Sequence, residues 1–210
     1  PGQVNAARSF HVTRDVAQHV LDACHDHEWR LLFALSRFGG LRCPSEHLAL
    51  TWGDVDWERH RFRVRSAKTE HHDDGGERMV PLFPELRPHL EEAFDAALEG
   101  SVYVIARHRE PNINLRTQLC RIIRKAGLTP WPRLFHNLRA SRETELAKVY
   151  PMHVVCKWIG NSPRVAADHY LQLTEADFES AAKSAAESGA VAVQKAVQQA
   201  AAPFRNDSQE

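Results

Sequence analysis

The chain has 210 residues, enough for one large domain or one and a half small ones with a substantial buried core. Its 27 basic residues balance 27 acidic ones, so the total charge does not by itself indicate a nucleic-acid partner. No apolar run approaches the roughly 20 residues that a membrane-spanning helix needs, and the first residues do not resemble a signal peptide. These features exclude a membrane protein and favour a globular protein of the cytoplasm.

The first residue and the cysteines give two further expectations. The sequence begins with Pro1 rather than methionine, which indicates a piece of a longer protein. The cysteines are scattered without a Cys-x-x-Cys pair, so we expect reduced thiols that pack inside a cytoplasmic protein. They are Cys24, Cys43, Cys120 and Cys156.

The charges are unevenly distributed along the chain. Basic residues crowd the segments 59–68 and 116–133, whereas acidic residues concentrate in 85–95 and after Thr174. A basic face opposite an acidic back would suit DNA. An ordinary solvated mixture of charges explains the pattern equally well.

The first part of the chain is predicted to be helical. Thr13 is a suitable N-cap for a helix whose apolar face carries Val16, Val20 and Leu21. A second helix is predicted over 28–38, ending at the glycine pair 39–40, and a third begins at 44–46. Three short alternating segments follow, at 55–57, 61–65 and 78–80, and they predict a small antiparallel sheet with a polar turn at 71–76.

From residue 85 onward the chain is predicted to be helical again. The expected helices cover 85–97, 115–126, 137–149, 152–159 and 164–171, and prolines separate the later ones. The alanine-rich stretch 175–202 has high helix propensity, and residues 203–210 are expected to fray. The predicted fold is therefore mainly α with a small three-stranded antiparallel sheet (α+β).

An ordered set of chemically active residues runs through this framework. Arg42 follows Gly-Leu, Lys68 stands in Ala-Lys-Thr, His136 and Arg139 form a His-x-x-Arg motif, and Tyr170 follows Asp-His. Arginine suits a phosphodiester because its planar guanidinium offers two parallel hydrogen bonds. A histidine and a lysine can move protons, and a tyrosine can attack phosphorus. Each motif is common alone, whereas the ordered set is specific.

Together these motifs resemble the catalytic domain of the tyrosine recombinases, the phage-integrase family of DNA-rejoining enzymes, over about residues 12–178. The resemblance implies the tyrosine-recombinase catalytic-domain fold. It assigns phosphate stabilisation to Arg42 and Arg139, proton transfer to His136 and Lys68, and nucleophilic attack to Tyr170.

The position nine residues before Tyr170 holds Asn161, where the family most often has histidine. The asparagine amide can still donate a hydrogen bond to a phosphate oxygen, but it cannot titrate near neutral pH. A structural cap of the turn before Pro163 is the alternative. A second departure is that three residues, rather than the usual two, separate Arg42 from Glu46.

Tyr170 is selected from three tyrosines by its position. Tyr103 lies in an apolar run and is predicted to belong to the core, and Tyr150 precedes Pro151 at the end of a helix. Tyr170 alone stands in the family's register, 31 residues after Arg139.

The resemblance implies a site-specific DNA recombinase or integrase of a mobile element, which cuts and rejoins double-stranded DNA through a 3′-phosphotyrosyl intermediate. No cofactor is expected, and the full-length protein is expected to act as a homo-oligomer, a tetramer, on DNA. Two alternatives stay open: a type IB-like topoisomerase, and a catalytically silent DNA-binding regulator of the same fold.

The expected domains are a catalytic domain at 1–178 and a C-terminal helical tail at 179–210. The tail would dock in cis or on a neighbouring protomer, and a solvated helix is the alternative. The family's N-terminal DNA-clasping domain is not expected within this chain. No metal site is expected either, because the histidine-rich segments 25–27 and 71–74 match no recognised zinc spacing.

Overall fold

The computed structural model describes residues 9–66, 76–110, 113–169 and 177–180. The chain divides into two units, residues 1–172 and 173–210, and the described residues of the second unit, 177–180, are helical. The described elements of the first unit are α1 (Arg14–Ala23), α2 (His27–Arg37), α3 (Ser45–Ala49), the 3-10 turn η2 (Trp52–Asp54), β1 (Val55–Asp56), β2 (Arg61–Arg65), β3 (Glu77–Pro81), α4 (Arg87–Asp95), α5 (Leu115–Lys125), α6 (Leu134–Ala147), α7 (Met152–Ile159) and α8 (Pro163–His169). The predicted fold class is confirmed.

The sheet consists of β1, β2 and β3 in that order, with antiparallel neighbours. Phe62 pairs with Val80 across β2 and β3, and both side chains are fully buried. Alternate residues of β2 point to the other face, where Arg63 and Arg65 are half-exposed and pair with the buried Asp54. The alternation of arginine with apolar residues therefore follows the two faces of the strand, as the pattern predicted.

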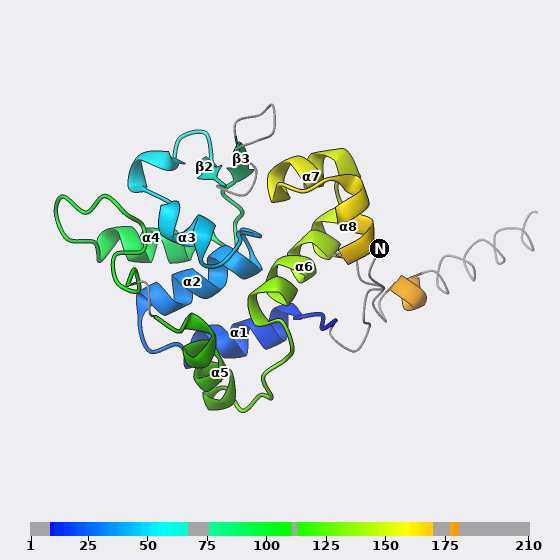
Figure 1. Cartoon of the computed structure of the whole chain (residues 1–210), viewed down its shortest axis with the longest axis horizontal. Helices are drawn as coiled ribbons and strands as arrows, with labels where there is room; N and C mark the ends of the chain where they lie inside the picture. Colours follow the sequence, from blue (N-terminus) through cyan, green and yellow to red (C-terminus); the bar gives the residue numbers. More distant parts are fainter. Residues whose placement is uncertain (1–8, 67–75, 111–112, 170–176, 181–210) are drawn as a thin grey trace, which may run out of the picture. The chain divides into compact units, whose positions relative to one another are not determined.

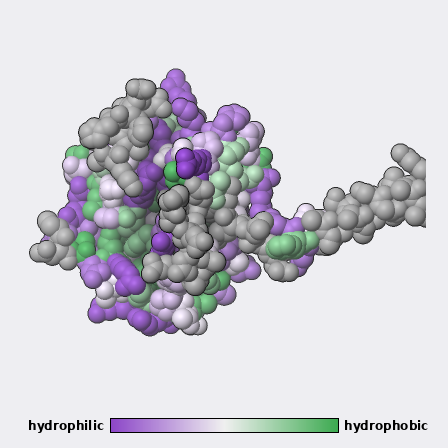
Figure 2. Space-filling model, turned by 45° about the vertical axis from the view of Figure 1, so that its right-hand side comes forward, coloured by the Kyte–Doolittle hydropathy of each residue, from purple (hydrophilic) through white to green (hydrophobic). Residues whose placement is uncertain are grey.

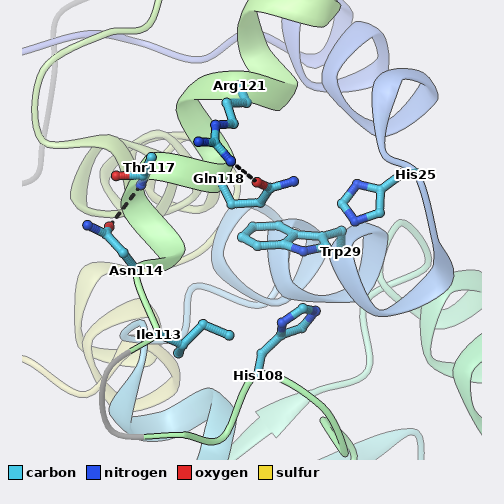
Figure 3. A pocket seen from close by; sticks show the side chains of 8 residues that line it. All are labelled: His25, Trp29, His108, Ile113, Asn114, Thr117, Gln118 and Arg121. Carbon is cyan, nitrogen blue, oxygen red and sulfur yellow. Dashed lines mark hydrogen bonds between the residues drawn. The ribbon is translucent and has the colours of Figure 1, made fainter.

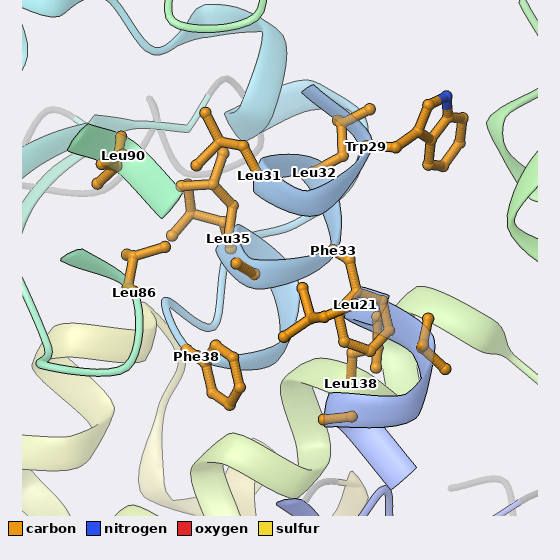
Figure 4. Close-up of a cluster of buried hydrophobic side chains, with 14 of the residues drawn as sticks. Leu21, Trp29, Leu31, Leu32, Phe33, Leu35, Phe38, Leu86, Leu90 and Leu138 are labelled. Carbon is orange, nitrogen blue, oxygen red and sulfur yellow. The ribbon is translucent and has the colours of Figure 1, made fainter. Parts of the chain in front are cut away.

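Helix α2 is the centre of the core. It packs against α4 and against α6, and α6 also contacts α7 (Figure 1). Its leucines and aromatic side chains are almost fully buried, and Figure 4 shows them together with side chains from α1, α4 and α6. Because apolar residues occur all around α2 over residues 31–35, this part of the helix is enclosed on every side.

A buried ion pair joins the end of α2 to α6. The Arg37 side chain is fully buried, and its guanidinium donates to both carboxylate oxygens of Glu145. Burial of an arginine is costly unless its charge is paired and hydrogen-bonded. The pair thus fixes α6 relative to the segment that follows α2, and both segments carry predicted site residues.

The prediction that Tyr103 belongs to the core is wrong. Tyr103 is 42% exposed and its neighbour Val102 is 60% exposed. The guanidinium of Arg109 lies 3.5 Å from the centre of the Tyr103 ring, and the Tyr103 backbone forms a bridge with Thr51. The first two residues of this apolar run therefore lie at the surface, where a cation packs on the Tyr103 ring, and only Val104 and Ile105 are buried.

The surface is mixed in polarity. Figure 2 shows hydrophilic residues interspersed with apolar areas on the face that it presents. No helix among the described residues is both long and apolar enough to span a membrane.

Gly40 is required by the backbone and by close packing at the end of α2. Its φ is +68°, and a Cβ atom there would lie 2.4 Å from Cδ1 of Ile159. We expect Gly40→Ala to lower the free energy of unfolding by about 2–3 kcal/mol, because it adds left-handed strain to a steric clash.

Gly127→Ala is the matched control for the Gly40 variant. Gly127 also has positive φ, +76°, but a Cβ atom there would meet nothing within 4 Å. Urea unfolding of both variants should therefore show the larger loss for Gly40→Ala. Equal losses would mean that packing against Ile159 contributes nothing.

Candidate active site

Arg42 lies in the short segment between α2 and α3, where Glu46 holds it. The backbone N–H of Arg42 donates to Glu46 Oε2 at 2.8 Å, and its Nη1 donates to Glu46 Oε1 at 2.6 Å. Its Nη2 donates to the carbonyl oxygen of Gly160, at the C-terminal end of α7. The extra residue between Arg42 and Glu46 therefore does not prevent the carboxylate from supporting the guanidinium. The Arg42 side chain keeps 22% exposure, so it is held but reachable.

Arg78 completes the support from the sheet. It donates to both carboxylate oxygens of Glu46, at 2.8 and 2.7 Å, and its Nε donates to the carbonyl oxygen of Trp158 at 2.8 Å. Such bidentate arginine–carboxylate pairs are strong and have a fixed geometry. Arg78 thus connects β3 with α3 and with the end of α7.

Glu46 is fully buried and remains ionised. Burial opposes its ionisation, but the hydrogen bonds and charge of Arg78, with the charges of Arg42 and Arg139, outweigh burial and lower the pKa of Glu46 to about 2. Three guanidinium groups therefore act on one buried carboxylate. We call Arg42, Arg78 and Arg139 the arginine cluster, and its excess of positive charge suits a phosphate.

The low pKa of Glu46 predicts acid sensitivity of the fold. The unfolded chain takes up the proton near pH 4.5 and the folded chain only near pH 2, so this stabilisation is complete above about pH 4.5 and disappears as the pH falls to 2. The difference corresponds to about 3 kcal/mol. We expect urea unfolding of the parent to weaken more steeply below pH 4.5 than that of Glu46→Gln. Parallel curves for the two proteins would contradict the assignment.

Helix α6 carries the His-x-x-Arg motif. It begins at Leu134, three residues earlier than predicted, so His136 lies in its first turn and Arg139 one turn further. His136 is half-buried, whereas Arg139 is only 2% exposed. Arg139 Nη1 donates to the carbonyl oxygen of Gly40, in the segment just before Arg42. The motif and the Gly-Leu-Arg segment therefore meet in the fold.

Asn161 follows the end of α7 and faces α6. Its Nδ2 lies 2.8 and 3.0 Å from the two carboxylate oxygens of Glu143. The preceding Gly160 has a φ of +80°, and its carbonyl oxygen binds Arg42, so Asn161 is adjacent to the arginine cluster.

The structure brings together Arg42, Arg139 and Asn161, with His136 one turn from Arg139. Lys68 and Tyr170 lie outside the described residues. Ser66, two residues before Lys68 in the sequence, lies 3.4 Å from Arg42 Nη1. Tyr170 directly follows the last residue of α8.

Two residues of this cluster were not predicted, Arg78 and Glu143. Arg78 is two positions before the buried Val80 in β3, so strand alternation indicated a side chain facing the interior. Glu143 is four positions after Arg139, which places both on one face of α6. The periodicity of each element was the signal that could have identified them.

A separate hollow of about 430 Å³ lies beside α2 and the start of α5 (Figure 3). Trp29 forms its floor, with His25 and His108 on either side of the indole and Asn114 and Arg121 among the residues of the α5 wall. None of the predicted catalytic residues lines it. Within the part of the chain that the structure describes, no group of three or more His, Cys, Asp or Glu side chains could hold a metal ion. The histidine-rich segment 71–74 lies outside the described residues.

Comparisons with solved structures place this fold among DNA recombinases. The XerA recombinase superposes with a TM-score of 0.66 at 16% identity, covering 97% of this chain and 68% of that one. The Tn1549 transposon integrase, solved with transposon right end DNA, gives 0.64 at 16% identity, covering 87% and 67%. A lambda integrase dimer bound to a COC′ core site gives 0.61 at 19% identity, covering 81% and 49%, so the chain spans about half of that protein.

Sequence comparison gives the family. Comparison with curated proteins found no significant match. The model of the phage integrase family matches residues 11–177, which is most of the chain and includes every motif of the predicted site. The chain therefore belongs to the phage integrase family, the tyrosine recombinases.

Proposed function

We propose that this chain supplies the catalytic domain of a site-specific DNA recombinase or integrase, with double-stranded DNA as its substrate. One observation carries the proposal: Arg139, 97 positions after Arg42 in the sequence, donates to the carbonyl oxygen of Gly40, two positions before Arg42, and the charges of both arginines act on the buried Glu46. Two preorganised guanidinium groups beside one buried carboxylate suit the charge that develops on a phosphodiester under attack.

In this mechanism Tyr170 attacks the scissile phosphorus and forms a 3′-phosphotyrosyl bond, while the bond to the 5′ oxygen breaks. Arg42, Arg139 and an amide N–H of Asn161 stabilise the non-bridging oxygens. His136 exchanges the proton of the phenol, and Lys68 protonates the leaving 5′ oxygen. The hydroxyl of a partner strand then reverses the step. Because the phosphotyrosyl ester retains the bond energy, the reaction needs no cofactor.

The direct test is trapping of the covalent intermediate. The full-length protein is incubated with nicked duplexes made from the DNA that flanks its gene, and the products are separated under denaturing conditions. We expect a protein–DNA adduct with a free 5′ hydroxyl on the released strand. DNA binding without any adduct would instead favour the catalytically silent regulator.

The topoisomerase alternative differs in what happens after cleavage. A topoisomerase lets the cut strand swivel, whereas a recombinase joins it to a partner. Relaxation of supercoiled plasmids that carry no target site would favour the topoisomerase, and strand exchange between two target duplexes would favour the recombinase.

We also propose a domain organisation for the chain. Residues 1–178 form the catalytic domain and residues 179–210 a tail that docks in cis or on a neighbouring protomer, coupling Tyr170 to the partner in a tetramer on DNA. Deletion of 180–210 should then reduce assembly on DNA, measured by gel shift and sedimentation. Unchanged assembly would leave the tail as a solvated helix.

A further inference from the structure

The contact between Glu143 and Asn161 joins α6 to the end of α7 beside the arginine cluster. Glu143 is fully buried, and Asn161 Nδ2 is within hydrogen-bond distance of both its carboxylate oxygens. The amide nitrogen faces Glu143, since both carboxylate oxygens lie within hydrogen-bond distance of it and an amide N–H can donate to them. The contact therefore fixes which way the Asn161 carboxamide is turned.

The geometry of this contact leaves part of the amide available. An amide NH₂ carries two N–H bonds that diverge widely in one plane, whereas the two oxygens of a carboxylate lie close together. Asn161 Nδ2 lies 2.8 and 3.0 Å from the two Glu143 oxygens, so one N–H donates to both of them in a bifurcated hydrogen bond. The second N–H points in another direction. Asn161 Oδ1 is buried and makes no hydrogen bond within the described residues, so it does not anchor the group.

The charges around Glu143 tie it to the same cluster. Burial raises the pKa of Glu143, and the Asn161 hydrogen bond and the charges of Arg139 and Arg42 oppose that rise. The charges of both arginines thus act on Glu143, which also accepts the hydrogen bond of Asn161.

We propose that Glu143 is a positioning residue: it holds one N–H of Asn161 so that the second N–H donates to a non-bridging oxygen of the scissile phosphate. This inference rests on the proposed function. It accounts for a neutral amide at position 161, because the donor needs a fixed orientation rather than a proton of its own to transfer.

A double-mutant cycle tests the proposal, with single-turnover cleavage of the nicked duplex as the readout. Asn161→Ala should slow cleavage by about tenfold or more, as for the loss of one transition-state donor. Glu143→Ala should slow it by a similar factor, and the double variant by no more than either single one. Factors that multiply in the double variant, or parental cleavage by Glu143→Ala, would overturn the proposal.

A conservative variant keeps the test decisive if Glu143→Ala does not fold. The amide oxygen of Glu143→Gln can still accept from Asn161, so we expect cleavage within about threefold of the parent. A loss as large as that of Asn161→Ala would overturn the positioning role. Asn114→Ala, which removes the cap of α5 away from this cluster, is the control and should cleave like the parent.

A modified phosphate separates a positioning role from a merely structural one. A methylphosphonate at the scissile position replaces one non-bridging oxygen by a methyl group. On the diastereomer that lacks the oxygen contacted by Asn161, neither Asn161→Ala nor Glu143→Ala should slow cleavage relative to the parent. Effects that persist on both diastereomers would overturn the inference. Failure of the parent to form any adduct on the unmodified nicked duplex would contradict the proposed function instead.

Discussion

Replacement of Tyr170 by phenylalanine is expected to abolish the covalent DNA adduct and leave DNA binding nearly intact. The substitution removes only the phenolic oxygen that would attack phosphorus. The contacts to phosphates that dominate affinity remain. Denaturing gels measure the adduct and gel shifts at fixed salt measure binding.

Tyr150→Phe is the matched control for Tyr170→Phe. Tyr150 is 41% exposed, and its ring packs edge-on against Trp158 with the centroids 4.9 Å apart, a contact that phenylalanine preserves. This variant should form the adduct like the parent. A denaturant-resistant adduct from Tyr170→Phe would show that another residue is the nucleophile.

The second large effect is expected for Arg139→Lys. Arg139 is 2% exposed, and its guanidinium donates to the carbonyl oxygen of Gly40. Lysine keeps the charge but lacks the planar fork that binds a carbonyl and a phosphate at once. We expect cleavage to fall by roughly 10²–10³-fold, the range for losing a preorganised transition-state donor.

Arg142→Lys separates this chemical loss from a loss of stability. Arg142 lies three positions further along α6, is similarly buried, and pairs with Glu85 and Glu145 outside the arginine cluster. Its replacement should lower the unfolding midpoint and leave cleavage by the folded protein near the parental rate. Equal losses of cleavage in both lysine variants would mean that Arg139 acts only through the packing of α6.

Local sequence determined the elements of this protein and their order. Thr13 caps α1 as predicted, since its side chain accepts a hydrogen bond from the backbone N–H of Val16. The alternation of β2 and the glycine pair after α2 predicted the sheet and the end of that helix. These features depend on residues a few positions apart, so they can be read directly from periodicity and capping.

The exact ends of the helices and the partners of the buried charged residues depended on the tertiary structure. Helix α6 starts at Leu134, before Asn137, and its N-cap is Arg133 in a left-handed conformation, a residue that no capping preference indicates. Glu46 is held by Arg78, 32 positions away, and Asn161 by Glu143, 18 positions away. The order of motifs therefore pointed to the family and to Arg42, His136 and Arg139, but not to Arg78 and Glu143, which complete the support of the site.

The physical reason is that secondary-structure elements depend on residues close in the sequence, whereas the partners of buried charges depend on residues far apart in it. Whether a segment becomes a helix or a strand follows from its own propensity and periodicity. Which charges meet follows from how those elements pack once α2 is enclosed by α4 and α6, and a buried charge is stable only where that packing brings it a partner. The sequence by itself thus determined the elements and the family motifs, and tertiary packing alone decided that Arg78 and Glu143 join Glu46 in the support of the site.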